Sequence, residues 1–165
     1  MRRRTLLKVG AFGAAVLAAG GVALRLADKP TAEARLDNMS KVLRAVVPAL
    51  LAGNLPADAA TRARAIEDGL QRTLATIEGL PPPTRAELDE LFALLASRPG
   101  RWLAGIESWE SATPDAVAQF LSRWRTHSID LFQTAYHALH DLVLGPWYAD
   151  ASTWKDIGYP GPIEL

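Results

Sequence analysis

Apolar residues recur every three or four positions through most of the chain between residues 36 and 144. This is the spacing of helices that bury one face. Proline and glycine interrupt the pattern at intervals, so it predicts several helices in succession. No stretch alternates convincingly with the period of two that is typical of strands. The sequence therefore predicts an all-α fold, a small bundle of four to five helices with short connections.

Residues that favour helix starts mark where these helices are expected to begin. Asp58 is a predicted N-cap, Thr84 opens a capping box with Glu87, and Thr113 precedes Pro114 at the first helical position. The expected helices cover residues 36–53, 58–79, 84–99, 113–127 and 129–144. Their predicted inner faces carry Leu36, Met39, Leu43, Val46, Leu50, Ile66, Leu70, Leu74, Ile77, Leu88, Leu91, Phe92, Leu95, Val117, Phe120, Leu121, Trp124, Ile129, Phe132, Ala135, Tyr136, Leu139, Leu142 and Val143.

Helix-breaking residues mark the expected ends. Pro48 is predicted to kink or end the first helix near Val47, because proline lacks the backbone N–H that an interior position donates. The pair Pro99-Gly100 is expected to end the third helix, and Gly145-Pro146 the last. Between the third and fourth helices, residues 101–106 predict a single helical turn.

Composition narrows the classes of protein to which the chain can belong. Its 165 residues suffice for one domain with a hydrophobic core. The formal net charge is zero, but the part from Arg35 onward holds twelve basic and sixteen acidic residues. A mildly acidic body without a basic stripe argues against nucleic-acid binding. The chain has no cysteine, which excludes disulfides, cysteine-ligated zinc and iron–sulfur clusters.

The N-terminal segment has the pattern of a twin-arginine export signal. Two arginines, a variable residue, two large apolar residues and a lysine precede sixteen uncharged residues, Val9–Leu24, which are rich in alanine and glycine. A plain membrane anchor with cytoplasmic positive charges is the alternative. The signal residues are Arg3, Arg4, Leu6, Leu7 and Lys8.

This signal predicts recognition by the twin-arginine translocase and a periplasmic location. Residues 1–34 form the signal peptide or anchor, and membrane contact is expected through residues 1–26. The A-x-A site Ala32-Glu33-Ala34 lies about ten residues beyond the apolar run and no good site lies closer, so the segment is either cleaved there or kept as an inner-membrane anchor. Residues 35–165 form the single helical domain.

A search for catalytic and metal-binding patterns yields one weak candidate. The sequence lacks G-x-S-x-G, G-x-G-x-x-G and the P-loop pattern. His137 and His140 stand three residues apart on the last expected helix, with His127 upstream. They are either ordinary histidines at the edge of the apolar face or ligands of a metal ion.

Tryptophan is concentrated in the second half of the chain. All five tryptophans lie beyond residue 100, and the expected tail, residues 145–165, mixes Trp and Tyr with Gly and Pro. We expect this tail to be irregular. Side chains as large as these either fold back over the bundle or bind a partner.

The string WYADASTWKDIGYPGP, residues 147–162, resembles the gluconate 2-dehydrogenase subunit 3 family. The twin-arginine N-terminus and the small helical body are similar to that family as well. The matching positions, which the resemblance marks as candidates for partner binding, are Trp147, Tyr148, Trp154, Ile157, Gly158, Tyr159, Pro160, Gly161 and Pro162.

The resemblance implies a non-catalytic small subunit of a periplasmic, FAD-dependent sugar or alcohol dehydrogenase. The FAD would belong to a large flavoprotein subunit of the glucose–methanol–choline class, exported together with this chain. A cytochrome c subunit often completes such complexes. No catalytic, cofactor-binding or metal-binding residue is carried over to this chain. Two alternatives stay open: a stand-alone periplasmic metalloenzyme using His127, His137 and His140, and a membrane-anchored interaction protein without a redox partner.

Overall fold

The computed structural model describes residues 31–154, 158, 160 and 161. This part of the chain contains six α-helices, two short 3-10 turns and no strand. The predicted all-α class is therefore confirmed. The helices are α3 (Ala32–Leu50), α4 (Ala59–Glu78), α5 (Pro82–Ala96), α6 (Arg98–Ala104), α7 (Pro114–Arg125) and α8 (Asp130–Ala149), and the 3-10 turns are η1 (Ala52–Asn54) and η2 (Ala151–Thr153).

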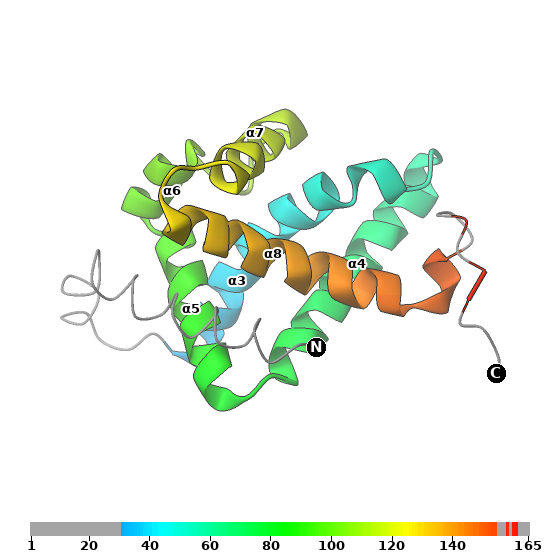
Figure 1. Cartoon of the computed structure of the whole chain (residues 1–165), viewed down its shortest axis with the longest axis horizontal. Helices are drawn as coiled ribbons and strands as arrows, with labels where there is room; N and C mark the ends of the chain where they lie inside the picture. The colour runs from blue at the N-terminus through cyan, green and yellow to red at the C-terminus, as the bar shows by residue number, and fades with distance from the viewer. Residues whose placement is uncertain (1–30, 155–157, 159, 162–165) are drawn as a thin grey trace.

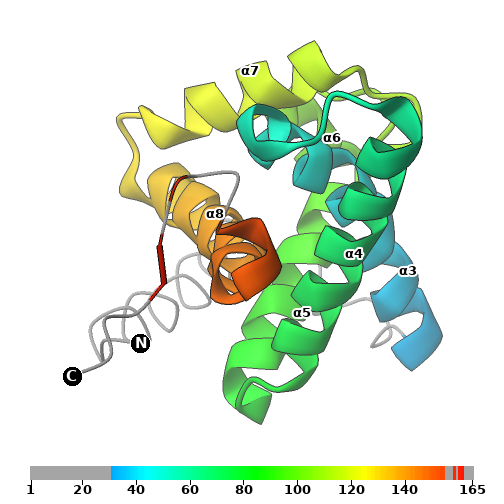
Figure 2. The same ribbon diagram turned by 90° about the vertical axis from the view of Figure 1, so that its right-hand side faces the viewer.

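Helix α3 lies at the centre and packs against α4, α5, α7 and α8. Figure 1 shows α8 running lengthwise across the molecule, in front of α3 and α4 in that view. Seen end-on in Figure 2, α8 lies beneath α7. The short helix α6 continues from the end of α5, against which it packs. The central position of α3 agrees with its continuous stripe of fully buried residues.

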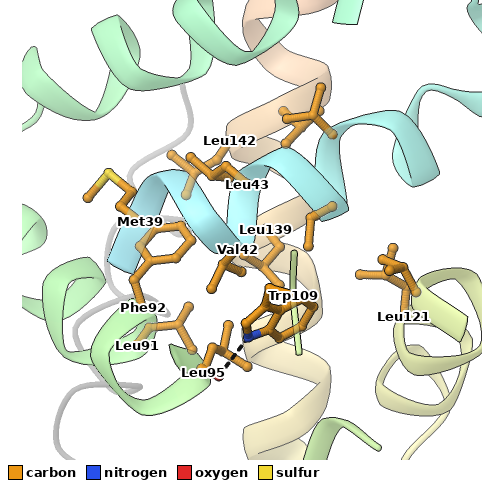
Figure 3. Packing of buried hydrophobic residues seen from close by; sticks show 14 of the residues in the cluster. Met39, Val42, Leu43, Leu91, Phe92, Leu95, Trp109, Leu121, Leu139 and Leu142 are labelled. Carbon is orange, nitrogen blue, oxygen red and sulfur yellow. Dashed lines mark hydrogen bonds between the residues drawn. The ribbon is translucent and has the colours of Figure 1, made fainter. Parts of the chain in front are cut away.

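Leucine, valine and aromatic side chains from α3, α4, α5, α7 and α8 fill the core, and α6 adds Ala104. The indole N–H of Trp109, in the loop between α6 and α7, donates a hydrogen bond of 2.8 Å to the carbonyl of Leu95 (Figure 3). Its ring packs edge-on against Phe120, which packs in turn against Trp124. Most of the predicted inner faces are confirmed, but Leu36 and Ile129 are more than half exposed. Both lie at helix starts, where the chain has only begun to enter the core.

Two of the predicted N-caps are confirmed and one is wrong. The side chains of Asp58 and Thr113 accept hydrogen bonds from the first turns of α4 and α7. The capping box at Thr84 does not form, because α5 already begins at Pro82. A proline suits the first helical position, where its missing N–H would have no partner.

The predicted helix ends near Pro48 and at Gly145-Pro146 are wrong. Helix α3 continues past Pro48 to Leu50, and α8 continues past Gly145-Pro146 to Ala149. Each proline lies in or near the last turn of its helix, where the loss of one backbone hydrogen bond is offset by burial of the next apolar residue. Leu51 lies three residues after Pro48, and Trp147 directly follows Pro146. Both Leu51 and Trp147 are buried. The irregular tail therefore begins about five residues later than predicted.

The end of α5 also differs from the prediction. Ser97, and not Pro99-Gly100, separates α5 from α6, and its hydroxyl caps α6 by accepting from the N–H of Gly100. Gly100 is required at this corner, because a Cβ there would lie 1.8 Å from the carbonyl oxygen of Leu94. Residues 101–104 of the predicted turn thus form the second half of a short helix, which ends at Ala104.

The part of the chain that the structure describes contains no helix with the length and apolarity needed to cross a membrane. The predicted export-signal residues, Arg3, Arg4, Leu6, Leu7 and Lys8, lie outside the described residues.

Candidate interaction surfaces

The first residues of the C-terminal motif lie on α8 and face the bundle. Trp147 is buried, and Tyr148 is half-buried against the core. The Trp147 ring packs close to Gly69 of α4, where a Cβ would lie 3.5 Å from the ring and 3.1 Å from Leu51. Glycine at position 69 thus lets α3, α4 and α8 approach one another. Trp147 fixes the end of α8 to the bundle.

Arg72 of α4 links the end of α8 to the rest of the bundle. The Arg72 guanidinium lies over the Trp147 ring, 5.8 Å from its centroid, and forms a salt bridge of 2.7 Å with Asp150. Hydrogen bonds from Ser152 to the Asp150 carboxylate, together with the charge of Arg72, hold the pKa of Asp150 below its usual value. Arg72, Trp147 and Asp150 form what we call the closed cluster.

The chain after α8 is held against the helix by short-range hydrogen bonds. The Thr153 hydroxyl donates to the carbonyls of Trp147 and Asp150, at 3.0 and 2.8 Å. The indole N–H of Trp154 donates to the carbonyl of Tyr148, at 2.8 Å. Gly161 lies next to the Trp154 ring, because a Cβ on Gly161 would lie 3.4 Å from that ring. These contacts favour the interpretation that the tail folds back onto its own bundle.

The remaining motif residues divide into an exposed group and an undescribed one. Gly158 and Pro160 are exposed, and Gly158 adopts a positive φ of 68°. The other predicted partner-binding positions, Ile157, Tyr159 and Pro162, lie outside the described residues. Among the described positions that match the motif, Gly158 and Pro160 are therefore the ones that a partner can reach most fully.

The three histidines do not come together as a metal site. The Nδ1 of His127 accepts from the N–H of Ile129, and its ring packs against Phe132. The Nδ1 of His140 lies 3.1 Å from the Oδ1 of Asp141. The rings of His137 and His140 both lie near the Tyr136 ring. Among the described residues, no group of three or more histidine or acidic side chains is arranged to hold a metal ion.

Among the described residues, the most exposed large apolar side chain is on α6, at a position that the sequence patterns did not single out. Trp102 is 79% exposed, and its neighbour Leu103 is 42% exposed. One signal was present in the sequence: residues 91–106 contain two arginines and no acidic residue, in an otherwise acidic body. A short helix with one exposed tryptophan has no periodicity from which its outward face could be predicted.

An open recess of about 580 Å³ lies beside Trp102. Its lining residues are Arg98, Arg101, Trp102, Gly105, Ile106, Glu107 and Ser108. Arg101 donates a hydrogen bond to the carbonyl of Ala96, and none of the salt bridges among the described residues involves Arg98 or Arg101. Trp102, Leu103 and this recess form what we call the α6 surface.

No protein-family model matches the chain, and neither a curated protein nor a solved structure matches it. The family resemblance therefore depends on the quoted residues of this sequence alone.

Proposed function

We propose that this chain is the non-catalytic small subunit of a membrane-associated, FAD-dependent sugar or alcohol dehydrogenase complex. It supplies the twin-arginine export signal and stabilises the flavoprotein that carries out the reaction. The observation that carries this proposal is the pairing, in one short chain, of the signal around Arg3-Arg4 with the C-terminal string WYADASTWKDIGYPGP.

The arrangement of the helices is consistent with a scaffold. The motif continues from α8, whose end is fixed by the closed cluster and by the hydrogen bond from Trp154 to Tyr148. A rigid surface loses little conformational entropy on binding. A subunit that binds only the folded flavoprotein also shifts its folding equilibrium toward the native state. These are the properties that a stabilising export partner needs.

In this proposal the chemistry belongs to the partner. FAD bound to the large subunit would accept the hydride from the substrate, and in complexes that contain a cytochrome c subunit that subunit would receive the electrons. The roles of this chain are to hold the folded flavoprotein and to present Arg3 and Arg4 to the translocase.

The export role is tested by replacing Arg3 and Arg4 together with lysine in the full chain, co-expressed with the flavoprotein. We expect both proteins to remain in the cytoplasm, as measured by fractionation and by dehydrogenase activity in the periplasm. Arg2→Lys is the matched control, because it changes a neighbouring arginine outside the pair and should leave export intact. A flavoprotein that still reaches the periplasm without the Arg3-Arg4 pair would contradict the carrier role.

The stabilising role is tested by purification of the tagged full chain from its native host. Mass spectrometry should identify a large flavoprotein of the glucose–methanol–choline class, and the complex should show flavin absorbance and dye-linked dehydrogenase activity. The chain purified alone should show neither. Stoichiometric FAD in the isolated chain would overturn the proposal.

A further inference from the structure

We propose that the α6 surface is a docking site for the flavoprotein subunit, occupied by a segment that presents an apolar contact next to a carboxylate. The identity of the partner rests on the function proposed above. The assignment of this surface rests on Trp102, the two arginines beside it and the recess between them.

The first argument is the exposure of Trp102. A tryptophan that is 79% exposed leaves most of a large apolar surface in water, next to the partly exposed Leu103. Tryptophan and arginine are the residue types most enriched among side chains that dominate binding energy at interfaces. An exposed tryptophan beside two arginines therefore has the composition of a protein-binding site.

The second argument is that α6 holds Trp102 in a fixed position. Arg123 of α7 donates a hydrogen bond to the carbonyl of Ala104, at the end of α6. Gly105 ends the helix with a φ of 69°, and a Cβ there would lie 2.6 Å from the Arg123 guanidinium. At the other end, Gly100 packs directly on α5. The outward direction of Trp102 is thus set by packing on both sides of the helix.

The third argument is charge. Arg35, Arg44 and Arg72 each form a salt bridge with a carboxylate of the same chain. Arg98 and Arg101 form none with the described residues, although the body carries an excess of acidic side chains. The guanidinium group matches a carboxylate with two parallel hydrogen bonds. A partner segment that carries a carboxylate is therefore complementary to Arg98 and Arg101 at this surface, beside the chain's own Glu107.

The shape of the surface favours a protein over a lipid bilayer. A recess of about 580 Å³ can receive a side chain or a loop, whereas a bilayer is flat on this scale. Glu107 at the recess also disfavours a uniformly anionic surface such as a layer of acidic headgroups. Two exposed apolar side chains on a seven-residue helix are a small area for insertion into a membrane.

The test measures binding of purified full-length chain to the flavoprotein identified by co-purification. Trp102→Ala is expected to weaken binding by about 30-fold or more. Arg98→Glu is expected to weaken it by about 10-fold and to reduce its dependence on salt. Ile129→Ala and Arg64→Glu are matched controls, since they change an exposed apolar residue and an exposed arginine elsewhere; both should bind within about twofold of the wild type.

The outcomes separate this inference from the proposed function. If the wild type binds the flavoprotein and both α6 variants bind it equally well, the docking site is elsewhere and the proposed function stands. If the wild type binds no flavoprotein, the proposed function fails and this inference fails with it. If Trp102→Ala lowers binding to vesicles of phosphatidylglycerol and phosphatidylethanolamine but leaves flavoprotein binding unchanged, the α6 surface is a lipid site and the inference is overturned.

Discussion

Tryptophan lies near arginine both in the closed cluster and at the α6 surface, and the two regions differ in whether the arginine forms a salt bridge and whether the ring is buried. In the closed cluster, Arg72 pairs with Asp150 and lies over the buried Trp147 ring. At the α6 surface, Arg98 and Arg101 form no salt bridge with the described residues, and Trp102 is exposed.

This difference shows that the same residue types can serve folding or binding, depending on what surrounds them. Trp147 is followed by Asp150 on the same stretch of chain and packs on Gly69, so the chain itself supplies a carboxylate and a close-fitting surface. No acidic residue lies between Glu90 and Glu107, and Glu107, which lines the recess, forms no salt bridge with Arg98 or Arg101. We expect the closed cluster to contribute to the stability of the fold. We expect the α6 surface to contribute to the affinity for a partner.

The largest expected effect is the loss of stability on truncating Trp147. Trp147→Ala should lower the free energy of unfolding by about 3–5 kcal/mol, because it leaves a cavity where α3, α4 and α8 meet. Urea or thermal unfolding followed by circular dichroism measures this loss. A change no larger than that caused by Trp102→Ala would remove the contrast between the two tryptophans.

The second prediction concerns the corner that orients α6. Gly100→Ala should destabilise the fold by about 3 kcal/mol or more, because the added methyl group collides with the backbone of Leu94 and cannot be relieved by a side-chain rotation. Gly145→Ala is the matched control, since no atom lies within 4 Å of its Cβ position. On α8 the control should be neutral or stabilising by up to about 1 kcal/mol. Equal effects of the two changes, measured by unfolding, would contradict the fixed corner.

The helical class and most of the core could be predicted from the sequence, because amphipathic periodicity records burial directly. The prediction failed where tertiary packing outweighs a local signal. Gly145-Pro146 has the composition of a helix end, yet Trp147 lies four residues after Val143 and extends the buried stripe of α8. The spacing from Val143 to Trp147 was the available signal, and burial of the indole outweighs the lost hydrogen bond.

The roles of the tryptophans could not be predicted, because composition does not distinguish a buried ring from an exposed one. Trp109 lies in a loop, where an exposed side chain would be the ordinary expectation, but it is buried. Its N–H donates a hydrogen bond to the carbonyl of Leu95, and its ring packs against Phe120. Trp102 lies on a helix and is exposed. Both outcomes depend on the corner at Ser97 and Gly100, which brings α6 onto the end of α5 and which local patterns did not reveal.

The third prediction uses the pH dependence of the closed cluster. Because the pKa of Asp150 is lowered in the folded state, its contribution to stability is fully present above the unfolded pKa of about 3.9 and is lost as pH falls through the folded pKa. Asp150→Asn should therefore destabilise the protein at pH 7 and show a shallower loss of stability below pH 4. Asp68→Asn on α4, a position without a salt bridge among the described residues, is the control, and unfolding curves at several pH values make the comparison. An unchanged acid profile would show that the Asp150 carboxylate adds nothing to the closed cluster.

The smallest expected effect is that of Trp102 on stability. Trp102→Ala removes a side chain that has little packing to lose, so the free energy of unfolding should change by no more than about 0.5 kcal/mol. Its fluorescence should change far more, because an indole in water emits at longer wavelength than the buried Trp109, Trp124 and Trp147. Loss of the long-wavelength, iodide-quenchable emission together with an unchanged melting curve is the expected pair of results. A large drop in stability would mean that Trp102 belongs to the core and that the α6 surface is not open to a partner.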